Sequence, residues 1–404
     1  MSKMVFHLII VSFILILFSC EDTTSFSQQT NHDPVEGTID STWAHRIADS
    51  SVAQFISGNH KINRGEYPIS VNNEGKLVTS SVHDWTAGFY PGTAWHLYSI
   101  TKNEQVLEIA RNWTANLEVH QHTKGTHDIG FIIMNSFGQG HKITGDVRYK
   151  DIIIQAARTL SERFNPTLGM IKSWDVDYHD FPVIIDNMMN LELLFYATKI
   201  SGDSSYYSIA VSHAEKTMNY HIREDNSVYQ FVDFNAANGN VKSRGNHQGE
   251  THTSTWSRGL AWGIYGFTMC FRETGNLAFL QTAENLAEFY LEHPNLTNDL
   301  VPFWDLNASG IPNTPRDASA GAIIASALFE LSGYMPANPT IRRTAEQMLF
   351  QLGHEPYFSK YNTNHNFFLK QGTGHYPAGQ YVNAPLNYAD YYFAESLKRY
   401  LNHF

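Results

Sequence analysis

The sequence predicts an all-α protein, an (α/α)6 barrel in which six helical hairpins close into a toroid. About twelve segments carry apolar residues at helical spacing, and convincing strands are few. The helices also come in pairs: one that begins with polar or aromatic residues is followed by an ordinary amphipathic one. Repeated pairs are typical of stacked or closed helical arrays. An open solenoid is the alternative, but the unusual loops before the first helix of each pair favour a ring, because there they would wall one pocket.

The expected helices follow one another along residues 41–404, which we take as one folded domain. Their predicted ranges are 42–58, 86–101, 103–121, 128–142, 147–163, 183–200, 204–221, 255–273, 275–292, 317–333, 339–353 and 385–402. In the third of these, one face carries Val106, Ile109, Ala110, Trp113 and Leu117. Breakers such as "SGDSS" and "YMPANPT" separate neighbouring helices.

The N-terminal segment has a different composition. Residues 1–20 hold an early lysine, a long apolar run and then "LFSC", which is typical of a secretory signal peptide. A small residue before Cys20 resembles a bacterial lipoprotein cleavage box, so we expect Cys20 to carry lipid and the protein to lie in the cell envelope. A plain signal peptide or a membrane anchor is the alternative. Residues 21–40 are polar and are expected to be a tether.

Composition narrows the classes of partner. The formal net charge of −11 argues against nucleic acid and anionic membrane surfaces, which leaves the lipid on Cys20 as the expected membrane contact. Aromatic residues make up 13% of the chain and charged residues only 17%, against a typical ~25%, so a large core is expected. The chain has 20 histidines but no HExxH and no cysteine–histidine zinc spacing, and no metal site is expected. Cys270, in an apolar run, is expected to be a small buried hydrophobe.

Two aspartates stand at the starts of apolar helices. Asp186 opens "DNMMNLELLFYA", in line with Asn190, and Asp128 follows His127 in "HDIGF". Burial and a neighbouring carboxylate both raise a carboxyl pKa, so a paired acid of this kind suits a general acid. Each aspartate could instead be a helix N-cap. Gly130 leaves room for close packing beside Asp128.

Aromatic residues and an arginine lie in the same group of loops. Helical spacing places Arg258, Trp262 and Tyr265 on one face, where a guanidinium and an indole suit a sugar that bears a carboxylate. A cation–π pair in an ordinary core is the alternative. Tryptophans near other helix starts favour a carbohydrate cleft; they are Trp85, Trp174 and Trp256.

Five segments together resemble glycoside hydrolase family 88, the unsaturated glucuronyl hydrolases. They read "WTAGFYPG", "HDIGF", "IIDNMMNLELL", "STWSRGLAWGIYGF" and "NYADYYFAESLKRY", in the family's order, over roughly residues 85–402. The resemblance implies an (α/α)6 barrel without a cofactor. It also implies removal of a 4,5-unsaturated uronic acid from the non-reducing end of oligosaccharides made by polysaccharide lyases.

The resemblance also implies roles for individual residues. Asp186 matches the general acid/base, and Asp128 matches a second essential aspartate that contacts the sugar. The positions that match the terminal-sugar subsite are Trp85, His127, Gln248, Trp256, Arg258 and Trp262, with His247 beside them; our own inference is that Arg258 meets the uronate carboxylate. Two departures bear on the substrate. Gln230 stands where the family often has a histidine, and residues 370–390 lack the serine and lysine pattern associated with sulfated glycosaminoglycans.

Two other functions remain open from the sequence. An unsaturated rhamnogalacturonyl hydrolase shares the barrel and the chemistry, although "HDIGF" argues against it. A surface lipoprotein that only binds glycans would use the same aromatic residues, although binding alone does not require two inward aspartates.

Overall fold

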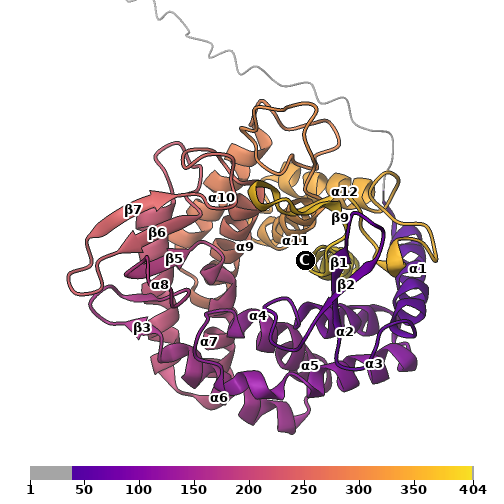
Figure 1. Cartoon of the computed structure of the whole chain (residues 1–404), viewed down its shortest axis with the longest axis horizontal. Coiled ribbons are helices and arrows are strands. Elements are labelled where there is room, and N and C mark those ends of the chain that lie inside the picture. The colour runs from indigo at the N-terminus through magenta and orange to yellow at the C-terminus, as the bar shows by residue number, and fades with distance from the viewer. Residues whose placement is uncertain (1–38, 403–404) are drawn as a thin grey trace, which may run out of the picture. The chain divides into compact units, whose positions relative to one another are not determined.

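The computed structural model describes residues 39–402. The predicted signal peptide, lipid-bearing Cys20 and nearly all of the predicted tether lie outside these residues. Within them the helices form two concentric rings (Figure 1).

The inner ring is built from the first helix of each predicted pair. Its members are α2 (Phe89–Thr101), α4 (Ile129–Ile133) with its continuation, α7 (Asn187–Ser201), α9 (Ser257–Thr274), α11 (Ala318–Tyr334) and α13 (Asn387–Leu401). Helix α13 packs against both α11 and α2, and α4 packs against α7, so the ring closes. This closure excludes the open solenoid and confirms the (α/α)6 barrel.

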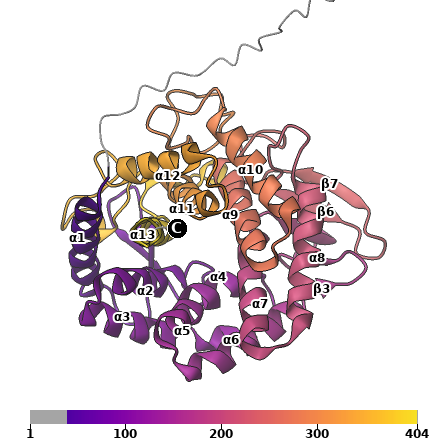
Figure 2. The same cartoon turned by 180° about the vertical axis from the view of Figure 1, so that it is seen from behind.

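The outer ring holds the amphipathic partners (Figure 2). They are α1 (Ser41–Asn59), α3 (Glu104–Ala115), α6 (Val147–Ser161), α8 (Ser204–His221), α10 (Leu277–Leu291) and α12 (Pro339–Leu352). Inner α11 is buried at every position from Ala318 to Leu331, whereas outer α10 buries one face, at Phe279, Ala283, Leu286 and Tyr290. The burial pattern therefore explains why inner α11 carries apolar residues on all sides, whereas outer α10 is amphipathic.

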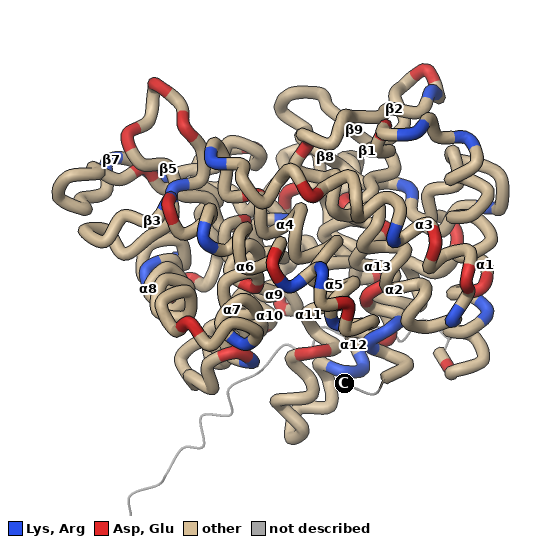
Figure 3. The backbone as a smooth tube through the Cα atoms, turned by 90° about the horizontal axis from the view of Figure 1, so that it is seen from below, with Lys and Arg blue, Asp and Glu red and all other residues tan. Residues whose placement is uncertain are grey.

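Within residues 39–402, nine short strands lie between the helices. They are β1 (Tyr67–Val71), β2 (Leu77–Ser80), β3 (Phe164–Asn165), β4 (Met170–Ile171), β5 (Phe181–Ile184), β6 (Phe231–Phe234), β7 (Val241–Gly245), β8 (Gly372–His375) and β9 (Gln380–Ala384). All pair antiparallel, as β1–β2, β3–β4, β5–β6–β7 and β8–β9. In the side view β1, β2, β8 and β9 lie together at one end of the barrel (Figure 3).

Three predicted helices differ from the structure. The helix expected at 103–121 ends as α3 at Ala115, and a separate 3-10 turn, Glu118–His122, follows it. Residues 183–186 were expected to be helical, but "FPVI" forms β5 against β6, and α7 begins only at Asn187. Aromatic and β-branched residues suit a pleated surface, which decided this segment. The helix expected at 128–142 is interrupted: a π-helical turn, Met134–Gly138, separates α4 from α5 (Gln139–Thr144).

Candidate active site

Two inner helices hold the predicted acids side by side. Asp128 immediately precedes α4, and Asp186 immediately precedes α7. A Cβ added at Gly130 would lie 2.5 Å from the Cα of Asn190, so α4 and α7 approach as closely as their backbones allow. The Asn190 side chain also accepts a hydrogen bond of 2.7 Å from the backbone N–H of Phe131. Close packing and this bond fix the two helix starts relative to each other.

Neither acid caps its helix. Both occupy the capping position, yet neither side chain accepts a backbone N–H there, whereas Asp203 accepts one at the start of α8. The Asp128 carboxylate accepts a 2.7 Å hydrogen bond from the Thr126 hydroxyl, and its other oxygen lies 3.4 Å from Nε2 of His127. Oδ2 of Asp186 has no hydrogen-bond partner among the described residues. The capping alternative therefore explains neither carboxylate.

The surroundings of Asp186 change its acidity. Burial raises the pKa of Asp186 to about 7, Arg258 opposes that rise, and the Asp128 charge adds to it. The indole N–H of Trp262 lies close to the Asp186 carboxyl and lowers this pKa slightly. The distance and angle between them do not meet the criteria for a hydrogen bond, so Nε1 of Trp262 and Oδ2 of Asp186 both remain without a partner among the described residues. A carboxyl with this pKa is present in both its protonated and its ionised form at neutral pH, so it can donate a proton and also accept one.

A cavity of about 590 Å³ opens beside these acids. Its lining is Ile69, Asp84, Trp85, Thr86, Trp174, Val176, Tyr178, His179, Gln230, His247, Gln248, Arg258, Gly374, His375, Gln380, Tyr381 and Tyr388. Asp186 and Asp128 are not in this lining. However, the Asp186 charge acts on the pKa of both Arg258 and Tyr388, so Asp186 lies near two lining residues. The volume and the mixed aromatic and polar walls fit a small saccharide.

Five predicted substrate-binding residues line this cavity: Trp85, Trp174, His247, Gln248 and Arg258. The Trp85 ring is backed by Phe131 and Tyr388, each 5.5 Å away between centroids. The Trp174 ring stands edge-to-face on the buried His127, 6.1 Å away. Both indoles therefore have fixed orientations and a face or edge toward the cavity.

Three predicted binding residues lie behind the lining instead. His127, Trp256 and Trp262 are buried, and none of them lines the cavity. The Trp256 ring lies under the Arg258 guanidinium at 4.5 Å, and the Trp262 ring packs between Phe131 and Tyr392. The expected stacking of these two indoles on a sugar is not available in this arrangement; they support Arg258 and Asp186 instead.

Arg258 has protein partners at both terminal nitrogens. Nη1 lies 2.6 Å from a carboxylate oxygen of Asp317 and donates to the Thr373 carbonyl, while Nη2 donates to the Gly374 carbonyl. The sequence suggested that Arg258 meets the uronate carboxylate; in this structure Asp317 and two carbonyls already accept three of its five N–H groups. Its positive charge remains close to Asp186 and holds that pKa below the value that burial alone would give.

The position where a histidine was expected is filled by a glutamine network. Oε1 of Gln230 accepts from the backbone N–H groups of His247 and Gln248, at 2.6 and 3.0 Å. Its Nε2 donates to the Gln248 side chain at 2.7 Å, and Gln248 in turn donates to the Gly374 carbonyl. Gln230 thus orders the loop that carries His247 and Gln248.

Several lining residues were not predicted from the sequence. Tyr388 stands in the first turn of α13, inside the quoted segment "NYADYYF", and its position at an inner-helix start was the available signal. His179, His375 and Tyr381 come from irregular loops and short strands, where no periodic pattern points to a site.

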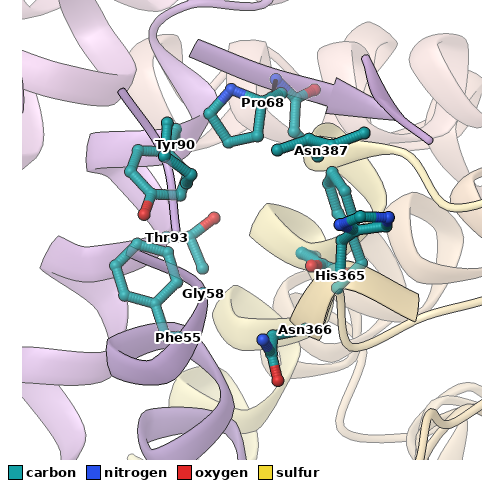
Figure 4. Close-up of a pocket in the computed structure, with 12 residues that line it drawn as sticks. Phe55, Gly58, Pro68, Tyr90, Thr93, His365, Asn366 and Asn387 are labelled. Atoms are coloured by element: carbon teal, nitrogen blue, oxygen red, sulfur yellow. Dashed lines mark hydrogen bonds between the residues drawn. The ribbon is translucent and has the colours of Figure 1, made fainter. Parts of the chain in front are cut away.

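A smaller pocket lies elsewhere, between α1, α2 and the turn at His365 and Asn366 (Figure 4). Phe55 and Tyr90 form one side of it, and Pro68 and Asn387 border it. Its volume is only about 30 Å³, little more than a water molecule needs. It cannot take a saccharide.

Within residues 39–402, no group of three or more histidine, cysteine, aspartate or glutamate side chains could hold a metal ion. In the same part of the chain, the helices are too short or too polar to cross a bilayer. Cys270 is fully buried in α9 and unpaired, as its apolar surroundings predicted.

The family model described as Glycosyl Hydrolase Family 88 matches residues 63–403. The chain belongs to this family. A family relative, an unsaturated glucuronyl hydrolase of Formosa agariphila, is 46% identical over 83% of this chain and 86% of its own length.

Solved structures of family 88 enzymes have the same fold as this chain. An unsaturated glucuronyl hydrolase specific for heparin superposes with a TM-score of 0.88 at 38% identity, over 90% of this chain and 98% of its own. A mutant enzyme from Streptococcus agalactiae, solved with the disaccharide dGlcA-GalNAc6S, has a TM-score of 0.78 at 25% identity, over 90% of this chain and 93% of its own. The family 88 barrel and a glycoside hydrolase activity are thereby shown for this chain.

Proposed function

We propose that this protein is an unsaturated glucuronyl hydrolase that removes the non-reducing-end 4,5-unsaturated uronic acid from lyase-generated oligosaccharides. The observation that carries this function is Asp186: a buried carboxyl, unpaired at Oδ2, with a pKa raised to about 7, beside a second aspartate and a saccharide-sized cavity. The names of its relatives support the same reaction.

The chemistry needs one acid that cycles between two forms. The C4=C5 bond of the substrate is an enol ether. Neutral Asp186 donates its proton to C4, which leaves an oxocarbenium-like charge shared by C5 and the ring oxygen. The resulting carboxylate takes a proton from water as that water attacks C5, so Asp186 is neutral again.

The product of this addition falls apart without a further catalytic group. The hemiketal at C5 opens to a ketone, and the released ring oxygen leaves C1 as a hemiacetal. That hemiacetal collapses to an aldehyde and frees the remaining saccharide. Ordinary glycosidases instead need an acid together with a nucleophile or base at C1.

The other site residues have supporting roles in this proposal. Asp128 contacts the sugar and, through its charge, raises the pKa of Asp186. Trp85 and Trp174 offer apolar walls for the flattened ring, while Gln248 and His247 offer polar contacts. Trp262 and Arg258 hold the surroundings of Asp186, and no cofactor takes part.

The test is the ultraviolet absorbance of the conjugated double bond. Unsaturated disaccharides from chondroitin, hyaluronan, heparin, ulvan and gellan lyases should lose this absorbance when the protein is added. Asp186→Asn should slow the decay by at least about a thousandfold while the far-ultraviolet circular dichroism stays the same.

Two results would decide for the alternatives. Full activity of Asp186→Asn removes the proposed role of this residue. Saturable glycan binding without turnover of any unsaturated substrate favours the binding lipoprotein, and turnover of pectin-derived fragments alone favours a rhamnogalacturonyl specificity.

We further propose that the mature chain is a cell-envelope lipoprotein anchored through Cys20. Support comes from the apolar segment that ends in "LFSC" and from the polar stretch after it. An alkyne fatty acid supplied during bacterial expression should label the protein, and Cys20→Ala should abolish the label. Because Cys270 is buried in α9, it does not compete for acylation. An unlabelled, secreted wild-type chain would indicate a plain signal peptide.

A further inference from the structure

Three imidazoles meet on one wall of the cavity. His179, His247 and His375 all line it, although they come from three separate segments of the chain. The rings of His179 and His247 lie 5.8 Å apart, and each packs on Phe231 with a centroid distance of 4.5 Å. Nε2 of His375 lies 3.0 Å from the carbonyl oxygen of His247. We call these three residues the histidine wall.

The protein leaves one ring nitrogen or more of each residue available. A carbonyl oxygen only accepts, so Nε2 of His375 carries a proton and donates it to His247, which leaves Nδ1 of His375 open. Nδ1 of His179 faces the Asp233 carboxylate at 3.3 Å, which leaves its Nε2 open. The His247 ring has no hydrogen bond to the described residues. Each ring therefore has a nitrogen that a ligand could use.

The charges around the wall are uneven. Burial and the nearby imidazoles of His179, His252 and His375 lower the pKa of His247. Of the three wall histidines, only His179 faces the Asp233 carboxylate. Lys242 lies 4.0 Å from Asp233 and 3.8 Å from Asp180. No carboxylate of the described residues pairs with His247 or His375. Positive charge on His247 or His375 therefore lacks a counter-charge from the protein, whereas His179 has Asp233.

The rest of the described lining supplies little free positive charge. Arg258 is its one arginine, and it contains no lysine. Asp317 and two backbone carbonyls accept hydrogen bonds from the Arg258 guanidinium, so its charge already has a partner in the protein. The one carboxylate in the lining, Asp84, accepts hydrogen bonds from the backbone N–H and hydroxyl of Thr86. Within this cavity the histidine wall is thus where a ligand anion gains most.

We propose that the histidine wall is a specificity subsite that receives an anionic substituent, a sulfate ester or a carboxylate, on the sugar next to the uronate. The proposal rests on the function proposed above, which places that sugar in the same cavity. Binding of the anion draws protons onto the open nitrogens of His179, His247 and His375, and each protonated ring then donates a charge-assisted hydrogen bond. A neutral sugar would gain no such bond. Affinity for the charged saccharide therefore rises as pH falls from 8 to 6.

The test compares ligands that differ in one substituent. Titration calorimetry with Asp186→Asn protein measures binding of an unsulfated unsaturated disaccharide, its sulfated counterpart, and one with a carboxylate on the second sugar. The Asp186→Asn background prevents turnover and removes the titration of Asp186 from the pH dependence. Measurements at pH 6 and pH 8, in two buffers of different ionisation enthalpy, also report proton uptake.

The expected result is stated as the ratio of the affinities of the charged and the neutral ligand. At pH 6 the charged ligand should bind about tenfold or more tightly than the neutral one, with net proton uptake, and at pH 8 the ratio should approach one. Adding His375→Gln or His179→Gln should remove most of the pH-dependent part of this ratio. His45→Gln, on the exposed face of α1, is the matched control and should leave it unchanged. Whichever charged ligand shows the effect identifies the substituent.

Other outcomes would contradict the proposed anion subsite. The proposal would be overturned if the affinity ratio does not change with pH, or if its pH dependence is the same in His375→Gln and His179→Gln as without them. Loss of affinity for neutral and charged ligands alike would mean that the wall only shapes the cavity. Failure of the wild-type protein to consume any unsaturated substrate would contradict the proposed function instead, and the binding ratio would still decide this inference.

Discussion

Both ends of the barrel interior bury acidic side chains, but they treat them in opposite ways. At the N-terminal ends of the inner helices, Asp186 is buried with Oδ2 unpaired, and its pKa is raised to about 7. Toward the C-terminal ends lies an ion network made of Glu192, Arg272, Glu330, Glu395 and Arg399. In it Glu330 bonds Arg272 at 2.9 Å and Arg399 at 2.5 Å.

Pairing reverses the effect of burial on acidity. Burial by itself would raise the pKa of Glu192, but Lys142 and Arg272 lower it to about 2. Burial likewise acts to raise the pKa of Glu330, and Arg272 and Arg399 outweigh it. The same barrel thus uses buried carboxylates for structure where arginines surround them. Where the opposing charge is weaker, as at Asp186, the pKa stays raised, as the proposed proton donor requires.

The largest change in stability is expected from a substitution that breaks the ion network. Glu330→Gln leaves the half-buried Arg272 and the buried Arg399 with one fewer negative partner, and we expect it to lower the free energy of unfolding by about 3–5 kcal/mol. Urea denaturation at pH 7 measures the change. Glu108→Gln, on the exposed face of α3, is the control and should stay within about 0.5 kcal/mol of wild type. A loss no larger than that of the control would mean that the network contributes little.

The next effect has the opposite sign and comes from the other end of the barrel. A raised acid pKa favours the fold most below the unfolded pKa near 4, and this contribution is lost as pH rises through about 7. Ionised Asp186 therefore costs stability at pH 8, and Asp186→Asn should raise the free energy of unfolding there by about 1–3 kcal/mol. At pH 4 the gain should nearly vanish.

A second buried acid provides the contrast for that measurement. Burial also raises the pKa of Asp390, to about 8, but its two oxygens accept backbone N–H groups from Phe368 and Leu369, both at 2.9 Å. Asp390→Asn replaces one acceptor with a donor and should destabilise the protein at either pH. If Asp186→Asn destabilises to the same extent at pH 8, the unpaired carboxyl is not a strained functional group.

The smallest effect is a shift in a pH profile. The Asp128 charge raises the pKa of Asp186, so Asp128→Asn should lower that pKa and move the alkaline limb of kcat/KM to lower pH. Activity at pH 7 should fall at least about tenfold, because less Asp186 is protonated and a sugar contact is lost. An unchanged limb with a lower plateau would mean that Asp128 only binds substrate.

Much of the barrel was predictable because its signals are local. Helical periodicity gave the boundaries of most helices within a few residues, and it paired "NEQVLEIARNWTA" of α3 with the apolar helix before it. The error at residues 183–186 arose because "FPVII" suits both a buried helix and a strand. Pairing with Phe231–Phe234, almost fifty residues later, decided between them.

The site was predictable only in part. Asp186 and Asp128 could be selected because an acid at the start of an apolar helix is costly unless it has a role. Trp256 and Trp262 were expected to face the sugar. Helical spacing predicts the side of the helix on which a residue lies, but it does not predict which other side chains cover that residue. Arg258 was expected to meet the uronate carboxylate, but in the structure it donates a hydrogen bond to Asp317, fifty-nine residues away.

The sequence by itself determined the class of fold, the family and the residues able to do the chemistry, because periodicity, composition and short motifs are properties of neighbouring residues. Only the tertiary structure decided which of those residues line the cavity, which acid stays unpaired, and that His179, His247 and His375 form one wall. Burial and charge pairing set these properties, and both depend on segments that are distant in the chain and meet only when the ring closes.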